Sequence, residues 1–221
     1  MKNEEIRDII AKNDDDKMSF YLSTLLSKCK DIEKENNFIA LLMIILILLF
    51  YSTNFAQLES LQIGPLSVKD VNSVKVFIPL VFSFLIFRYI LINNHKGEIE
   101  RIIKNFTKEF FNYEDMKIDI NTQIDDFTRT ILPISNYAEI SHLTTKGISK
   151  FGCFGSILIL PLTLIVLIPF FLEYIWIKDY LNDFPKFNFF QKASIILSIW
   201  INIVSIYYII HRAIISYKEN V

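Results

Sequence analysis

The chain has few of the residues on which enzyme chemistry and nucleotide binding usually depend. Two cysteines, three histidines and five glycines occur among its 221 residues. His95, His142 and His211 are far apart in the sequence, and the cysteines form no C-x-x-C pattern, so no metal site is predicted. The glycines form no Walker loop, no G-x-G-x-x-G and no G-x-S-x-G motif. We therefore expect no enzyme activity and no cofactor.

An excess of charge of one sign is also missing. The chain carries 23 Lys and Arg residues against 24 Asp and Glu residues, which excludes a strong overall field for attracting nucleic acid. Cys29 and Cys153 fall on the side that is assigned below to the cytoplasm, so both are expected to be free thiols. No removable signal peptide is expected, because charged residues precede the first apolar run.

What the sequence does contain is four long apolar runs. Hydrophobic residues make up 52% of the chain, and they gather at 38–55, 74–92, 156–177 and 193–215. Each run is long enough, at about 1.5 Å per residue, to cross a hydrocarbon core of roughly 30 Å as a helix. The sequence predicts an all-α membrane protein, with four transmembrane helices arranged as two hairpins and a small, mainly helical cytoplasmic region.

The basic residues orient these spans. More of them lie before the first and third runs and after the second and fourth than in the two loops between, which places both chain ends in the cytoplasm. The residues on that side are Lys28, Lys30, Lys34, Arg88, Lys96, Arg101, Lys104, Lys146, Lys150, Arg212 and Lys218. The loops between carry Lys69, Lys75, Lys178, Lys186 and Lys192. The expected division is a cytoplasmic helix (1–37), a hairpin (38–92), a cytoplasmic insert (93–150), a second hairpin (151–215) and a cytoplasmic tail (216–221). The segments 56–73 and 178–192 are expected as short outer loops.

The segment before the first run has the pattern of an amphipathic helix. Its apolar residues follow a 4-3-4-3 spacing, which is a short heptad seam: Met18, Leu22, Leu25, Cys29 and Ile32. The acidic residues 14–16 suit the start of this helix. The seam could pack against the expected helix 94–113 of the same chain, or it could bundle with further copies, and two heptads do not choose between these.

The last run carries a polar stripe. Its members share one helical face: Gln191, Ser194, Ser198, Asn202, Ser205 and Arg212. An asparagine in the middle of a membrane is costly against lipid and usually faces protein or water. We predict that Ser194, Ser198, Asn202 and Ser205 line a pore with Arg212 at its inner mouth. Helix packing through small polar residues is the alternative interpretation.

The third run and the insert offer further candidates. Pro161 and Pro169 weaken the backbone ladder, so a kink or gate is possible in the third run. Glu173 could ring an outer mouth, or it could simply lie at the level of the headgroups. A face of the insert that could bind a gating ligand comprises Lys104, Phe106, Lys108 and Phe110. A solvated amphipathic face is the alternative there.

The order of elements also carries a resemblance. An amphipathic helix, a span, an outer loop with the sequence I-G-P-L-S-V-K-D at 63–70, a second span and a cytoplasmic helix follow one another. This order resembles small bacterial membrane effectors encoded in anti-phage operons, including the channel-type effector of Hailong systems. The resemblance implies an oligomeric membrane channel whose opening stops cell growth. It also implies control by a nucleotide or oligonucleotide signal from a partner enzyme.

Together these features predict a homo-oligomeric ion channel or pore-forming effector in a bacterial inner membrane, gated through its cytoplasmic domain. Its partners would be the lipid bilayer, further copies of the chain and the gating signal. Two alternatives remain. One is a non-conducting membrane binding protein such as a bacteriocin immunity protein, and the other is a small transporter.

Overall fold

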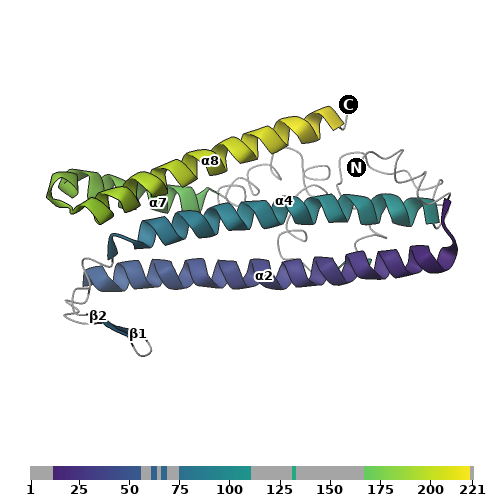
Figure 1. Ribbon diagram of the computed structural model, residues 1–221, viewed down its shortest axis with the longest axis horizontal. Helices are drawn as coiled ribbons and strands as arrows, with labels where there is room; N and C mark the ends of the chain where they lie inside the picture. The colour runs from purple at the N-terminus through teal and green to yellow at the C-terminus, as the bar shows by residue number, and fades with distance from the viewer. Residues whose placement is uncertain are drawn as a thin grey trace, which may run out of the picture. The chain divides into compact units, whose positions relative to one another are not determined.

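The described part of the chain is mainly helical. The computed structural model describes residues 12–55, 61–63, 66–68, 75–110, 131–132 and 167–219. In these ranges the elements are α2 (Asp15–Phe55), β1 (Leu61–Ile63), β2 (Leu66–Val68), α4 (Ile78–Phe110), α7 (Ile168–Asp183), the 3-10 helix η1 (Phe184–Lys186) and α8 (Phe189–Glu219) (Figure 1). The predicted helical class is confirmed for these residues.

Three of the described helices are long and apolar enough to cross a membrane. The helices α2, α4 and α8 contain 41, 33 and 31 residues. At about 1.5 Å per residue each of them exceeds the roughly 30 Å of a hydrocarbon core. The predicted third span lies partly outside the described residues, and α7 covers its end from Ile168 onward. Pro169 falls in the first turn of α7, where its missing N–H costs no hydrogen bond.

The predicted outer loop at 56–73 contains secondary structure that the sequence did not reveal. Strands β1 and β2 pair antiparallel, with Leu61 opposite Val68 and Ile63 opposite Leu66. This short hairpin is an addition to the otherwise helical class of the described residues. A strand of three residues is too short to show an alternating pattern in the sequence, which explains the miss.

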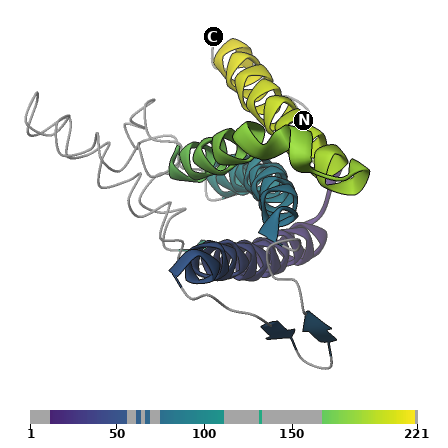
Figure 2. The same cartoon turned by 90° about the vertical axis from the view of Figure 1, so that its left-hand side faces the viewer.

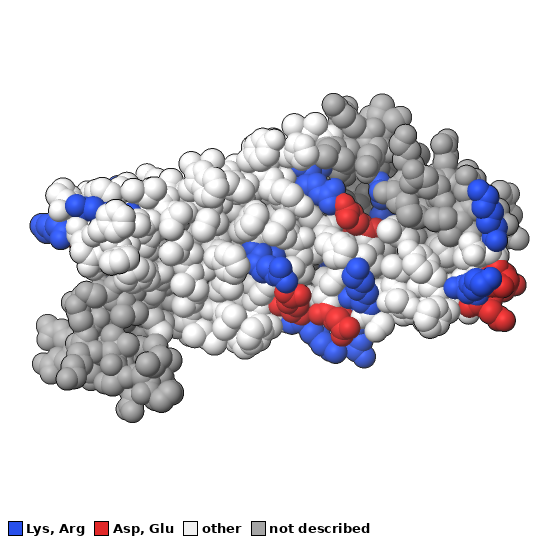
Figure 3. All heavy atoms as spheres, in the orientation of Figure 1, with Lys and Arg blue, Asp and Glu red and all other residues white. Residues whose placement is uncertain are grey.

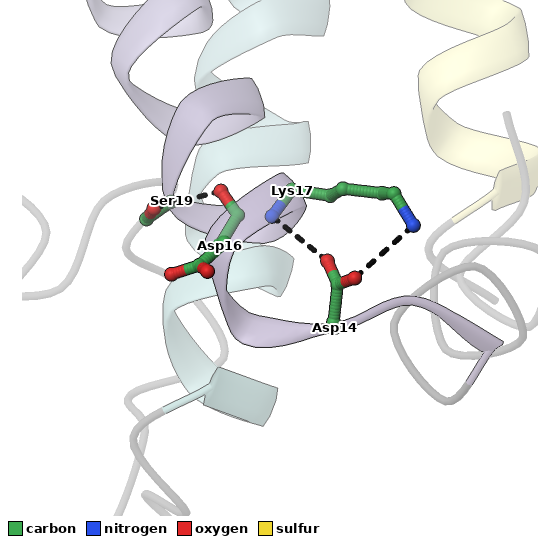
Figure 4. A network of polar contacts seen from close by, with 4 residues as sticks. All are labelled: Asp14, Asp16, Lys17 and Ser19. Carbon is green, nitrogen blue, oxygen red and sulfur yellow. Dashed lines mark hydrogen bonds and ion pairs between the residues drawn. The ribbon is translucent and has the colours of Figure 1, made fainter.

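Helix α2 begins where the acidic residues predicted a start. The backbone N–H of Lys17 donates to Asp14 Oδ1 at 3.0 Å, and the Lys17 ammonium donates to Asp14 Oδ2 at 3.1 Å (Figure 4). Asp14 therefore acts as the N-cap, because it satisfies a donor that the first turn leaves free. These two bonds from Lys17 lower the pKa of the Asp14 carboxyl below its ordinary value.

The chain forms two compact units. Unit 1 comprises Met1–Asn36 and Ile92–Thr163, and unit 2 comprises Asn37–Leu91 and Leu164–Val221. Helices α2 and α4 each contribute residues to both units.

In unit 1 the start of the heptad seam packs against α4 of the same chain, and bundling with further copies stays a prediction. Met18 and Phe106 are both buried and share a cluster. The rings of Tyr21 and Phe106 lie 5.5 Å apart, and Asn36 Nδ2 donates to Asn93 Oδ1 at 2.9 Å. The purple part of α2 and the teal part of α4 run beside each other (Figure 1). Cys29 is a buried free thiol within this seam, while Cys153 lies outside the described residues.

Unit 2 has an aromatic core. The rings of Phe50 and Trp176 stack at 4.2 Å, and Phe82 lies 5.0 Å from Trp176. Ile78 and Ile86 complete this cluster, so α2, α4 and α7 all contribute to it. In Figure 2, α7 is drawn in green and α8 in yellow-green to yellow. Trp176 is fully buried, which fixes the face that α7 turns inward.

The outer surface of unit 2 is apolar. The side chains of Leu41, Ile44, Ile45 and Leu48 are exposed along one side of α2. Apart from basic side chains (blue) at one end, the face of unit 2 that is drawn in Figure 3 is mostly white. An exposed apolar surface of this kind suits contact with lipid, as predicted for the first span.

Candidate functional site

A cluster of polar side chains lies inside the apolar bundle of unit 2. It comprises Ser83 of α4, Glu173 of α7, and Ser198 and Asn202 of α8. The exposed fraction is 1% for Glu173 and 0% for both serines. A carboxyl group is rarely buried to this extent without a specific reason, because removing a charge from water is costly.

Local helix geometry brings the four residues together. Ser198 and Asn202 are four positions apart on α8, so they share a face, and Asn202 Nδ2 donates to the Ser198 carbonyl at 3.0 Å. On α7, Glu173 lies three positions before the buried Trp176 and therefore faces the same core. Ser83 follows Pro79 by one helical turn and lies within hydrogen-bonding distance of its carbonyl, at 2.9 Å. At about 1.5 Å per residue, Ser198 lies about 14 Å beyond Phe189, the first residue of α8.

The hydrogen bonds converge on one carboxyl oxygen. Ser83 Oγ lies 2.6 Å from Glu173 Oε1, and Ser198 Oγ donates to the same oxygen. The two serine oxygens are 2.7 Å apart, and Asn202 Nδ2 donates to Ser83 Oγ at 2.9 Å. Each hydroxyl carries only one proton. Ser83 can therefore donate to only one of its three acceptors at a time: Pro79 O, Glu173 Oε1 or Ser198 Oγ.

Two acceptors of the cluster remain unsatisfied. Glu173 Oε2 and Asn202 Oδ1 are buried and have no hydrogen-bond partner among the described residues. Within the same part of the chain, no Lys, Arg or His side chain forms an ion pair with Glu173. The cluster thus has more hydrogen-bond acceptors than donors. Such an arrangement suits the binding of a positively charged species.

The predicted stripe of α8 is turned toward the inside of unit 2. Ser194 and Ser205 are buried, like Ser198. Ser194 Oγ donates to Val76 O at 3.4 Å, and Ser205 Oγ donates to Ile201 O at 2.8 Å on its own helix. Arg212 is half-buried and lies outside the cluster around Glu173. The stripe therefore takes part in packing within one chain, and its role in lining a pore stays a prediction.

Gln191 has a role that the sequence analysis missed. Its backbone N–H donates to Asn188 Oδ1 at 2.9 Å, and its side-chain Oε1 accepts from the Asn188 N–H at 3.0 Å. This reciprocal pair is a capping box at the start of α8. The N-x-x-Q spacing at 188–191 was the available signal, and it marks Gln191 as a residue that begins a helix.

Glu173 and Ser83 are the other differences from the sequence analysis. Glu173 was expected at an outer mouth or at the headgroups; the structure buries its side chain beside α4 and α8, and its depth in a membrane stays a prediction. Ser83 was not singled out at all. A polar residue within each of two apolar runs was the only signal, and nothing in the sequence indicated that the two side chains meet.

The predicted ligand face of the insert is only partly described. Phe106 is 1% exposed and packs with Met18 and Tyr21, so it belongs to the core of unit 1. Lys104 is half-buried. The side chains of Lys108 and Phe110 lie outside the described residues, and ligand binding at this face stays a prediction.

Comparisons of the chain with protein families, with curated proteins and with solved structures found no match. They assign neither a family nor an activity.

Proposed function

We propose that the protein is a homo-oligomeric ion channel of a bacterial inner membrane. The proposal includes four spans in two hairpins, with both chain ends in the cytoplasm. Three described helices of sufficient length and apolarity support the membrane location. The positions of the basic residues support the orientation. The number of copies would be read from the mass of the detergent-solubilised protein.

The buried cluster around Glu173 is the observation that carries the proposal. An ionisable residue in an apolar bundle is expensive, and such residues usually mark a path for ions or protons. Here the carboxyl group is joined by the hydroxyls of Ser83 and Ser198 and by the amide of Asn202. These groups offer a polar lane beside the apolar and aromatic core cluster of this bundle.

Gating belongs to the cytoplasmic region in this proposal. Helices α2 and α4 each contribute residues to both units, so they are continuous connections for a conformational change. A nucleotide or oligonucleotide that binds the insert would shift their packing in unit 1. Opening would dissipate ion gradients and arrest growth, as expected for an effector in anti-phage defence.

Conductance of the purified protein in liposomes tests the proposal. Asn202→Leu removes one polar group from the lane while keeping a side chain of similar size. We expect ion flux to fall about tenfold, because losing one hydrogen-bonding group raises a barrier by about 1.4 kcal/mol. Ile203→Leu is the matched control, since Ile203 is the exposed neighbour on α8 and its replacement should leave the flux unchanged. Equal flux through both variants would remove this lane from the conduit.

A specific observation favours a second candidate, a non-conducting membrane binding protein such as an immunity protein. The hydroxyls of Ser194 and Ser205 are satisfied by backbone carbonyls within the chain. A polar stripe whose hydroxyl groups are engaged in helix packing does not require a water-filled pore. This candidate predicts no ion flux in liposomes for the unmodified protein, so the same measurement separates the two functions.

A further inference from the structure

Among the described side chains, none supplies a positive charge that compensates the buried carboxyl group of Glu173. Its contacts from α4 and α8 come from Ser83, Ser198 and Asn202, which are all neutral. A bare carboxylate that is removed from water costs several kcal/mol even after relaxation. Two hydroxyl donors on one oxygen reduce this cost, but the second oxygen has no hydrogen-bond partner among the described residues. The site therefore favours one added positive charge.

The ionisable groups on the surrounding elements are engaged or directed elsewhere. Lys75 lies 4.7 Å from the ring centre of Phe50, and Lys192 lies 5.7 Å from that of Phe184. Arg88 is exposed, and the Tyr180 ring packs edge-on against Phe50. The apolar run of α2 contributes Tyr51, which packs against Phe50 and Trp176. On the described parts of α7 and α8 the other ionisable side chains are Tyr174, Lys178, Asp179, Asp183, Tyr207, Tyr208, His211 and Arg212, and none is paired with Glu173.

The spacing of the oxygens suits a proton better than a metal cation. The oxygens of Ser83, Ser198 and Glu173 lie 2.6 and 2.7 Å apart, which are separations that a shared hydrogen spans. A metal cation keeps each oxygen ligand at about 2.0 to 2.6 Å, so its ligands lie roughly 3 Å or more from one another. Coordination by these oxygens would force the cluster apart.

The hydroxyl groups can serve both charge states without any movement of the helices. When the carboxyl group is ionised, Ser83 and Ser198 both donate to Glu173 Oε1. When it is protonated, its O–H can donate to Ser83 Oγ while the Ser83 proton turns to Pro79 O at 2.9 Å. Ser83 then accepts from Glu173 and Asn202 and donates once, which satisfies a hydroxyl completely.

We propose that Glu173 is a reversible proton-binding site and that the proton is the ion carried through the bundle. The first half concerns the site itself, and the second half rests on the channel function proposed above. Ser83 and Ser198 act as positioning residues that supply a donor when the carboxyl group loses its proton. Asn202 holds Ser83 in place through its amide.

Labelling with dicyclohexylcarbodiimide tests the site directly. This apolar reagent modifies protonated carboxyl groups, and mass spectrometry of the full-length protein in nanodiscs locates the modified residue. We expect Glu173 to be labelled at acidic and neutral pH, with labelling that falls as the pH rises and does not change when NaCl replaces choline chloride. Ser198→Ala removes a donor to the charged form, so Glu173 should react faster in this variant at the same pH.

Three results would overturn the inference. The first is protection of Glu173 by NaCl, which would assign the site to Na⁺. The second is an unlabelled Glu173 in a recovered peptide at every pH. The third is a liposome flux that is carried by Na⁺, K⁺ or Cl⁻ and persists in Glu173→Gln. A protein that shows no flux of any ion yet labels at Glu173 as described would refute the channel and leave the proton site standing, so the two failures are distinguishable.

Discussion

At the scale of single residues, not every buried polar atom of unit 2 makes hydrogen bonds as Glu173 Oε1 does. The hydroxyl of Tyr180 is buried and has no hydrogen-bond partner among the described residues. Its ring packs against Phe50 and Phe187 at 6.2 and 6.0 Å between ring centres. Burial raises the pKa of Tyr180 above its ordinary value. The ring therefore contributes to packing, whereas the hydroxyl adds a desolvation cost.

We predict that Tyr180→Phe leaves the protein equally stable or stabilises it by about 1 kcal/mol. The change keeps the ring contacts and removes a buried group that makes no hydrogen bond. Thermal unfolding in detergent measures the effect. Tyr180→Leu is the control, because it loses the ring contacts and should lower the unfolding temperature. A clear loss of stability in Tyr180→Phe would mean that the hydroxyl has a partner, such as an ordered water.

At the scale of elements, unit 1 is held by an ion cluster as well as by the heptad seam. Lys96 of α4 is buried and pairs with Glu33 of α2, and its ammonium lies 3.7 Å from Glu100 Oε1. These residues connect the N-terminal part of α2 to the second half of α4. A buried pair of this kind is sensitive to the loss of one partner, since the remaining charge is left without compensation.

We predict that Lys96→Met destabilises the protein by about 3 to 5 kcal/mol, because two carboxylates would then share the site without a cation. Denaturant unfolding in detergent, followed by circular dichroism, measures this change. Lys34→Met is the matched control. Lys34 pairs with Asp31 on the exposed side of α2, where an ion pair contributes about 0 to 1 kcal/mol. Equal effects of the two substitutions would contradict a buried role for Lys96.

At the scale of elements the sequence was also a good guide to where helices lie. The 4-3-4-3 seam of α2, its acidic start and the apolar runs of α4 and α8 were all visible, because each depends on neighbours within the same segment. The hairpin of β1 and β2 and the capping box of Asn188 and Gln191 were missed. The strands were too short to give a pattern. Gln191 had been assigned to the polar stripe, and Asn188 lay in the expected outer loop.

At the scale of the whole molecule, the proposed channel has a consequence for the cell. A conducting effector dissipates the membrane potential when it opens, whereas a membrane binding protein leaves it intact. The apolar outer surface of unit 2 and the buried cluster around Glu173 are compatible with a protein that remains in the bilayer in either case. The physiological outcome therefore discriminates between the two candidate functions.

We predict that overexpression in bacteria arrests growth and depolarises the cells, as followed by a potential-sensitive dye. The reason is that an excess of channels raises leak through the inner membrane. Asn202→Leu should restore growth at equal protein level, and Ile203→Leu should remain toxic. Normal growth and potential at high levels of the unmodified protein would favour the non-conducting binding protein.

The candidate site could be predicted only in part. Ser198 and Asn202 were recognised because their spacing on one helix defines a common face. The position of Glu173 relative to Ser83 and Ser198 depends on the rotation and depth of three separate helices. No local pattern encodes these two quantities, so Glu173 was expected near the headgroups and Ser83 was overlooked.

By itself, the amino-acid order determined that this chain forms long apolar helices, because helix periodicity and exclusion from water act within each segment. Only the tertiary structure decided what the polar residues of those helices meet. Ser83, Glu173 and Asn202 come from different helices and converge through the packing of Trp176 against Phe50 and Phe82. Side-chain packing between distant segments sets that convergence, and it exists only once the helices have assembled.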